Sequence, residues 1–367
     1  MTNQPIQKII FGSPGTGKSH LIKSEIIPDL IKDEDIDKQE KKRESNVIHA
    51  VFHPEYTFGD FIGKLLPIST KSGSVEYRFY EGHFLKALAQ AYKNIIVAHD
   101  TSGKKISEPE NVVLVIDEIN RGNSSSIFGS IFQLLDREED GWSSYKTTIH
   151  GIVFLKLFEM VGFDIASTTS SGEIATVKLP LLGSKAKTID DMNDIMKEIA
   201  GFDLINKTIK IPPNLHIIAT MNTSDNSIYH MDTAFKRRWD WEFIDIDSKT
   251  VAEPGIAFYY NSENEKEPEN KEYFDFIQKL NYFIKSNHNY IRGVEDKQIG
   301  RYFIKGFENQ ISYTVVQSKL MFFIWDSVFN RDKKPLADLL GVPKDELVTF
   351  GDFALKVKSF IKAIQER

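Results

Sequence analysis

The eight residues from Gly12 to Ser19 have the types and spacing needed to bind the phosphates of a nucleotide. They read Gly-Ser-Pro-Gly-Thr-Gly-Lys-Ser and fit Gly-x-x-x-x-Gly-Lys-Ser/Thr at every fixed position. Glycines allow main-chain N–H groups to close around a triphosphate, at the start of a helix that already favours anions. In such loops the lysine reaches the β- and γ-phosphates, and the hydroxyl after it binds Mg²⁺. The predicted nucleotide-binding residues are Gly12, Ser13, Pro14, Gly15, Thr16, Gly17, Lys18, Ser19 and His20.

The alternative interpretation of this stretch is a glycine-rich turn that fits the pattern by chance. Its context argues against that alternative. A strand-like run, Lys8–Phe11, precedes the glycines, and an apolar segment with helical spacing, Leu21–Leu30, follows them. Because strand, glycine loop and helix in that order form a phosphate site, the sequence predicts that the chain binds a nucleoside triphosphate.

Two adjacent carboxylates follow an apolar run and could activate water. Val112–Ile116 is continuously apolar and leads into Asp117 and Glu118. Burying an ionised carboxylate at the end of a strand costs free energy unless a cation lies close enough to pair with it. Beside a phosphate loop that cation is Mg²⁺, which Asp117 would hold directly or through water, while Glu118 orients or deprotonates the attacking water. The alternative is a pair of acids that only ends a strand.

A second apolar run, from His216 to Met221, ends in the amide of Asn222. A neutral side chain at that point can hydrogen-bond both the γ-phosphate and the attacking water. Asparagine is also a common turn former, which is the alternative reading. Because an acidic strand of the kind described above accompanies it, we favour the functional role.

Residues 231–238 form a short predicted helix whose last turn is cationic. Lys236, Arg237 and Arg238 either complement the negative end of the helix dipole or supply an arginine finger to a neighbouring subunit. Such a finger contributes roughly 10³–10⁵ in rate. We favour the finger and place Arg238 ahead of Arg237.

Short β-branched runs alternate with helical patterns over the first 250 residues, which predicts an α/β domain with a mostly parallel five-stranded sheet. The predicted core strands are 8–11, 47–52, 112–116, 215–220 and 241–246. We expect the densely charged residues 33–45 to form an exposed connection and residues 71–74 to form a hairpin turn. We expect residues 141–210 to be an insertion, with a helix near 188–199. A polar linker at 251–272 and a small α-helical domain at 273–367 complete the expected organisation.

Composition limits the possible functions. The 367 residues include no cysteine, which excludes disulfides and thiolate metal sites. A net charge of −6 argues against strong nonspecific DNA binding by this chain alone. We expect a cytoplasmic protein, because neither a secretory signal nor an apolar run of membrane-spanning length is visible.

Together these motifs resemble the AAA+ superfamily: a Walker A loop at 12–19, a Walker B strand at 112–118, a sensor 1 amide at Asn222 and an arginine-finger helix. A narrower resemblance, to the McrB-type GTPases of modified-cytosine-dependent restriction systems, covers roughly residues 8–247. Three segments carry it: Phe52-His-Pro-Glu-Tyr-Thr-Phe-Gly-Asp-Phe61, Asp117-Glu-Ile-Asn-Arg-Gly-Asn123 and Met221-Asn-Thr-Ser-Asp225. A weaker similarity lies in Gln298-Ile-Gly-Arg-Tyr-Phe303.

The resemblance implies an AAA+ core followed by a helical lid, and a hexameric, Mg²⁺-dependent NTPase that prefers GTP to ATP. It also implies a McrC-like nuclease partner, with DNA contacted through the complex. By motif match, Asn222, Thr223 and Asp225 would surround the γ-phosphate, and Arg301 would be a sensor 2 cation or, equally, a solvated lid residue.

The chain departs from the family pattern in two ways. Asn226 replaces an arginine, which removes any role of that arginine. The glycine loop begins at Gly12, so we expect no N-terminal DNA-reading domain, and either DNA recognition lies on another chain or this chain is a motor-only form.

Two other functions fit the same motifs. The chain could be an ATP-specific AAA+ remodelling or chaperone-like ATPase, because the glycine loop contacts only phosphates and does not select the base. It could also be a nucleotide-gated scaffold without turnover, although the intact Asp117 and Glu118 pair argues against that class.

Overall fold

The computed structural model describes residues 4–33, 35–71, 73–183, 185–223, 229–246, 257–259, 269–304 and 310–367. Their contacts divide the chain into two compact units. The first unit comprises Met1–Ile10, Ser19–Met221 and Ser227–Glu242, and the second comprises Phe11–Lys18, Asn222–Asn226 and Phe243–Arg367. The predicted domain boundaries at 250 and 273 stay predictions.

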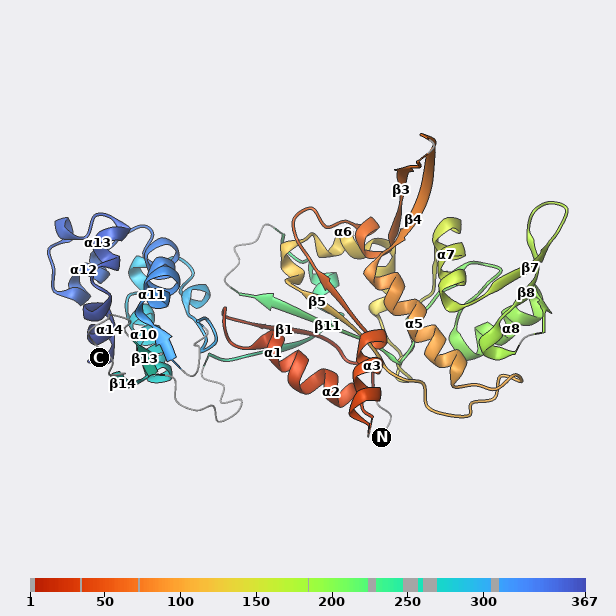
Figure 1. Ribbon diagram of the computed structural model, residues 1–367, viewed down its shortest axis with the longest axis horizontal. Coiled ribbons are helices and arrows are strands. Elements are labelled where there is room, and N and C mark those ends of the chain that lie inside the picture. Colours follow the sequence, from red (N-terminus) through yellow and green to blue (C-terminus); the bar gives the residue numbers. More distant parts are fainter. Residues whose placement is uncertain are drawn as a thin grey trace. The chain divides into compact units, whose positions relative to one another are not determined.

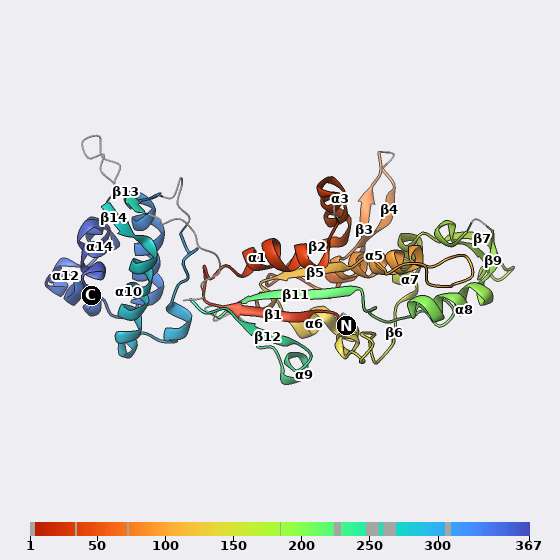
Figure 2. The same cartoon turned by 90° about the horizontal axis from the view of Figure 1, so that it is seen from below.

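A five-stranded parallel sheet forms the centre of the α/β fold (Figure 1). Strands β11 and β2 both pair in parallel with β5, and main-chain hydrogen bonds from Ile217 N to Ile6 O and from Thr223 N to Gly12 O show that β1 runs parallel to β11. Figure 2 shows β1, β11 and β5 side by side. The predicted fold class is therefore confirmed. The order across the sheet is β12 (Asp240–Phe243), β1 (Gln7–Gly12), β11 (Leu215–Asn222), β5 (Val112–Asp117) and β2 (Val47–Val51).

The central strands are buried because both faces of the sheet are covered. The five apolar residues Val112–Ile116 of β5 have 2% or less of their surface exposed. Helix α5, His83–Val97, packs on β5 and β2 with Phe84, Leu88 and Tyr92 in the same core. Continuous apolar strands are typical of sheets covered in this way. All five predicted core strands are present, although the last one begins at Asp240 and ends at Phe243 rather than at residue 246.

The helices of the first unit flank the sheet. The charged stretch at 33–45, which we expected to be a connection, is mostly helical, because Asp35 caps α3 by accepting from the N–H groups of Asp37 and Lys38. Short helices follow β1, β2, β5 and β11. The helices are α1 (Lys18–Leu21), a π-helical turn at Ile22–Ile26, α2 (Ile27–Leu30), α3 (Ile36–Asn46), α4 (Phe58–Phe61), α6 (Ser124–Phe128) and α9 (Thr233–Lys236).

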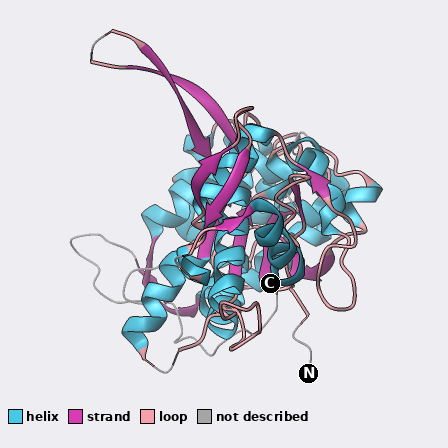
Figure 3. Ribbon diagram, turned by 90° about the vertical axis from the view of Figure 1, so that its right-hand side faces the viewer, coloured by secondary structure: helices cyan, strands magenta, loops and turns pink. Residues whose placement is uncertain are grey.

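A long hairpin projects from the first unit (Figure 3). Its strands are β3, Gly63–Ser69, and β4, Val75–Glu81, and they pair in antiparallel register. The predicted turn at 71–74 joins them and is therefore confirmed. Between α4 and α5 this hairpin carries exposed apolar residues, including Tyr77.

The predicted insertion at 141–210 packs onto the core of the first unit. Its helix α8 spans Ile189–Ala200 and confirms the predicted helix. Thr188 caps α8 by accepting from Asp191 N, and Met192 and Met196 are buried in the shared core. The remaining elements of the insertion are β6 (Thr147–Thr148), α7 (Gly151–Val161), β7 (Asp164–Thr168), β8 (Ile174–Lys178), β9 (Lys187–Thr188) and β10 (Thr208–Ile209).

The C-terminal residues of the second unit form a helical core of their own. Helices α10 and α14 pack against each other through residues such as Phe276 and Phe360, whose rings make an edge contact. Two short strands, β13 (Ala257–Tyr259) and β14 (Glu269–Glu272), lie within the stretch that we expected to be a linker. Strand β13 pairs with β14 on one side and with β15 (Gln310–Ser312) on the other. The helices are α10 (Tyr273–Ser286), α11 (Tyr313–Val315) with π-helical continuations, α12 (Lys334–Leu340), α13 (Phe350–Ala354) and α14 (Val357–Gln365).

Across the described ranges, each helix is too short or too polar to span a bilayer.

Candidate functional site

The carboxyl edge of the central sheet carries the predicted motifs. Gly12, Asn222 and Asp117 are the last residues of β1, β11 and β5, which are three neighbouring strands in the sheet. Because parallel strands end at a common edge, the sheet order brings the starts of these three motifs to that edge. Ligands of open α/β sheets bind at this edge.

The glycine loop turns tightly around its own lysine. Gly15 and Gly17 have φ values of 77° and 90°, a region that glycine adopts without steric cost. The Lys18 ammonium is buried and donates to the main-chain carbonyls of Gly12 at 3.0 Å and Ser13 at 2.9 Å. To reach a phosphate, Lys18 must exchange these carbonyl oxygens for phosphate oxygens.

Residues 298–303 lie against the glycine loop within the second unit. Gly300 N donates to Pro14 O at 2.8 Å, and Tyr302 N donates to Gly15 O at 2.8 Å. A Cβ atom at Gly300 would meet Gly15 O at 2.3 Å, so only glycine permits this main-chain approach. Arg301, the predicted sensor 2 residue, stacks its guanidinium 4.2 Å from the centre of the Phe274 ring, and its nucleotide role stays a prediction.

The acids Asp117 and Glu118 share one hydroxyl partner that the sequence analysis did not single out. Thr220 Oγ1 donates to Asp117 Oδ1 at 2.9 Å, and Glu118 N donates to Thr220 Oγ1 at 3.2 Å. Thr220 is 4% exposed. The signal that could have identified it is the single hydroxyl residue within the apolar run from Ile217 to Met221.

Glu118 has a left-handed backbone conformation, with φ 56° and ψ 47°. For a residue with a Cβ atom this conformation costs about 1–2 kcal/mol, so the surroundings must hold it. Arg121 N donates to Glu118 O at 2.9 Å, and Arg121 Nε lies 3.3 Å from Glu118 Oε2. The chain therefore turns sharply between two consecutive acids, at the point where strand β5 ends.

The predicted sensor 1 amide belongs to a half-buried strand end. Asn222 closes β11, and the N–H of the next residue, Thr223, donates to Gly12 O at 3.2 Å. Asp225, the other predicted γ-phosphate residue of this motif, lies outside the described residues.

The two candidate finger arginines have different surroundings. Arg238 donates to Asp136 Oδ2 at 2.7 Å and to Ala234 O at 2.7 Å, and its guanidinium lies 4.3 Å from the centre of the Phe132 ring. Its side chain is 7% exposed. A group engaged in this way inside its own subunit cannot reach a neighbour without breaking these contacts, which favours Arg237 over Arg238, while the finger role of either arginine stays a prediction. Arg237 is exposed and becomes the first candidate.

The residues predicted to hold Mg²⁺ offer the oxygen donors that this ion prefers. Asp117 supplies a carboxylate at a strand end, held by the Thr220 hydroxyl, and Ser19 supplies an exposed hydroxyl in the first turn of α1. Mg²⁺ in nucleotide sites uses one or two such protein ligands and completes its shell with phosphates and water. The donor set fits the ion.

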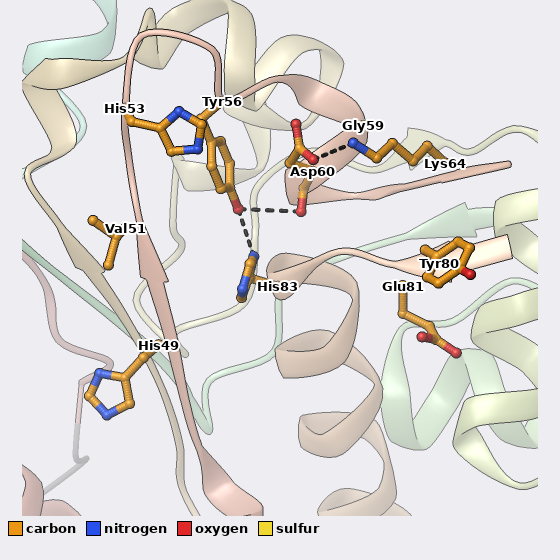
Figure 4. Close-up of a pocket in the computed structure, with 10 residues that line it drawn as sticks. All are labelled: His49, Val51, His53, Tyr56, Gly59, Asp60, Lys64, Tyr80, Glu81 and His83. Carbon is orange, nitrogen blue, oxygen red and sulfur yellow. Dashed lines mark hydrogen bonds and ion pairs between the residues drawn. The ribbon is translucent and has the colours of Figure 1, made fainter. Parts of the chain in front are cut away.

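A separate cavity of 480 Å³ lies beside β2 in the first unit (Figure 4). The Tyr56 hydroxyl lies 2.7 Å from His83 Nδ1 and 3.3 Å from Asp60 O. Burial lowers the pKa of His83 and raises that of Tyr56, so both are neutral at pH 7. No role was predicted from the sequence for these side chains. The cavity is lined by His49, Val51, His53, Tyr56, Gly59, Asp60, Lys64, Tyr80, Glu81 and His83.

Comparison with known proteins gives two relatives, although no protein-family model matches the chain. The type II restriction enzyme BsuMI component YdiS of Bacillus subtilis is 29% identical over 362 residues, which cover 92% of this chain and 82% of that protein. The type IV methyl-directed restriction enzyme EcoKMcrB subunit of Escherichia coli is 25% identical over 241 residues, which cover 65% of this chain and 35% of that longer protein. These similarities, together with the parallel sheet and its phosphate-loop motif, support a McrB-like restriction-system motor of the AAA+ superfamily.

Proposed function

We propose that the chain is a ring-forming NTPase, the motor subunit of a McrBC-like restriction complex that defends the cell against foreign DNA. The observation that carries this proposal is the pair of acids, Asp117 and Glu118, held by Thr220 at the edge where β1 ends in a complete phosphate loop. Similarity to two restriction-system proteins supports the biological setting.

In the proposed reaction, water attacks the γ-phosphorus and the bond to the β–γ bridging oxygen breaks, which yields a nucleoside diphosphate and phosphate. Glu118 accepts the proton of the attacking water. Lys18 and the loop N–H groups bind the β- and γ-phosphates, and Asn222 orients the γ-phosphate and the water. When bound, Mg²⁺ neutralises charge on the phosphates, and Ser19 and Asp117 would hold it.

Arg237 would complete the site of a neighbouring subunit. An exposed cation at the end of α9 is available for a contact between subunits, and such a cation stabilises the charge that develops on the transferred phosphoryl group. A closed ring of identical subunits repeats one heterologous contact, so each subunit both supplies and receives an arginine. Six subunits are the number that the family resemblance implies.

We propose GTP as the preferred substrate, a McrC-like nuclease as the partner, and DNA contact through the assembled complex. The similarity to the EcoKMcrB subunit supports these assignments. Because the phosphate loop does not contact the base, ATP is the alternative substrate, and with it an ATP-driven remodelling function.

The test is phosphate release from GTP and from ATP by the purified chain, with and without the product of the adjacent gene. We expect turnover of GTP that rises with the partner, and loss of that turnover in Glu118→Gln. Turnover of ATP alone would support the remodelling function. Absence of turnover with both nucleotides, in the presence of the partner, would refute the enzymatic proposal and leave the scaffold function.

A further inference from the structure

Asp117 and Glu118 are adjacent in sequence but serve different parts of the proposed reaction. One carboxylate binds a metal ion and the other accepts a proton from water, so the two side chains need different and fixed directions. In an extended strand, consecutive side chains point to opposite faces. The left-handed conformation of Glu118 breaks that alternation and sets a different direction for its carboxylate.

The Thr220 hydroxyl contacts both acids at this break. Strand β11 pairs with β5 in the register Ala219 to Ile116, which brings the next residue, Thr220, beside Asp117. A hydroxyl has one proton and two lone pairs. The Thr220 hydroxyl donates a hydrogen bond to Asp117 Oδ1 at 2.9 Å and accepts one from the N–H of Glu118 at 3.2 Å. One buried hydroxyl therefore acts as a donor to the first acid and as an acceptor from the second.

From this geometry we infer that Thr220 is a positioning residue for both acids, an inference that rests on the proposed function. Its bond to Oδ1 fixes the carboxylate of Asp117, whose other oxygen, Oδ2, would then hold the metal ion. Its bond to the N–H of Glu118 holds the strained turn from which the proton acceptor projects. The methyl group of Thr220 limits rotation about χ1, so the hydroxyl stays aimed at the acids.

Thr220 also links the acids to the sensor strand. Asn222 lies two residues further along β11, on the same face of the strand. A displacement of β11 on loss of the γ-phosphate would therefore move the hydroxyl that orients both acids.

The test compares three variants of the full chain. Thr220→Val replaces the hydroxyl with a methyl group of nearly the same size, and Thr220→Ser keeps the hydroxyl. Thr147→Val is the matched control, because Thr147 is also buried, at 5% exposure, and its hydroxyl bonds only to Gln133 and Ser130 among the described contacts. If Thr220→Val does not fold, Thr220→Ala takes its place.

Three quantities are measured: the melting temperature, the affinity for Mn²⁺ in the presence of a non-hydrolysable GTP analogue by electron paramagnetic resonance, and kcat and KM for GTP. For Thr220→Val we expect a Mn²⁺ affinity lowered about 10-fold and a kcat lowered about 100-fold, the range seen when a group behind a metal ligand is removed. KM for GTP should change little. Thr220→Ser should restore both values to within about 3-fold of wild type.

The inference is overturned if Thr220→Val retains wild-type Mn²⁺ affinity and kcat, or if Thr220→Ser loses as much as Thr220→Val. It is also overturned if Thr147→Val lowers both quantities equally, because the effect is then one of general stability. If the wild-type chain hydrolyses no nucleotide, the proposed function fails, and the Mn²⁺ affinity still decides the positioning role of Thr220.

Discussion

The guanidinium of Arg238 donates to the carboxylate of Asp136 at 2.7 Å, and this bond joins residues that lie 102 positions apart in the chain. The arginine also covers the ring of Phe132 and has only 7% of its side chain exposed. Arg238 therefore holds the loop before β12 in place within the first unit, and its exposed neighbour Arg237 is the arginine that we propose to act on another subunit.

Alanine at these two arginines should separate stability from catalysis. Arg238→Ala leaves Asp136, whose side chain is 29% exposed, without its charged hydrogen-bond donor and should lower the free energy of unfolding by about 2 kcal/mol, as measured by urea denaturation. Arg237→Ala should leave stability unchanged and slow hydrolysis about 10³-fold. Mixing Arg237→Ala with Lys18→Ala subunits should restore some turnover, because each supplies what the other lacks. Absence of recovery at every mixing ratio would remove the role in trans.

Substitutions at Lys18 and Glu118 should affect different steps. Lys18→Ala removes the cation that we propose to meet the β- and γ-phosphates, so binding of a fluorescent GTP analogue should be lost. Glu118→Gln keeps the size of the side chain but accepts no proton, so nucleotide should bind and remain intact. Mass photometry with GTP should then show an accumulated ring for Glu118→Gln, whereas only monomers in that variant would contradict the prediction.

Gly300→Ala should disturb the main-chain contact with the glycine loop. Its Cβ atom would meet Gly15 O at 2.3 Å, so the hydrogen bonds from Gly300 N and Tyr302 N must break or shift. Hydrogen exchange should rise over residues 298–303, and the melting temperature should fall by about 4 °C. Gly151→Ala is the control, because a Cβ atom there meets nothing within 4 Å. Equal behaviour of the two variants would show that the close approach is unimportant.

Stability of the first unit should fall as the pH decreases from 6.5 to 4. His216 is 1% exposed, and its Nδ1 accepts the N–H of Ile6 at 2.9 Å. Burial, and then the nearby Arg137 cation, lower the pKa of His216 to about 4. The unfolded chain, with a histidine pKa near 6.5, therefore binds more protons than the folded chain across this interval, which removes about 3 kcal/mol of stability by its lower end.

His216→Asn tests the source of that pH dependence. The asparagine carbonyl can accept the N–H of Ile6 but does not titrate. Urea denaturation at pH 6.5 and 5.5 should show a smaller loss of stability in the variant than in wild type. The same loss in both proteins would assign the pH dependence to other groups.

Much of the fold was predictable because its signals are local. Runs such as Val112–Ile116 are apolar along their whole length, and this pattern alone indicates a strand covered on both faces. The order of motifs then identified the carboxyl edge of the sheet. The helix at Ile36–Asn46 was not predicted because its residues are densely charged and resemble an exposed connection. The cap at Asp35 that starts the helix depends on the path of the backbone, which the sequence does not show.

The sequence did not identify the roles of Thr220 and Arg238. Each role depends on a partner about 100 positions away, Asp117 for Thr220 and Asp136 for Arg238. Strand order and register decide which distant residues meet, and neither is visible in local periodicity. The arrangement of His83 and Tyr56 in the cavity beside β2 was unpredicted for the same reason.

The most direct test of the central claim is a structure of the assembled chain with Mg²⁺ and a non-hydrolysable GTP analogue. We expect Lys18 on the β- and γ-phosphates, Ser19 and Asp117 at the metal, and Glu118 and Asn222 at the water that faces the γ-phosphorus. A triphosphate bound away from the glycine loop, or acids that face away from it, would contradict the proposed reaction.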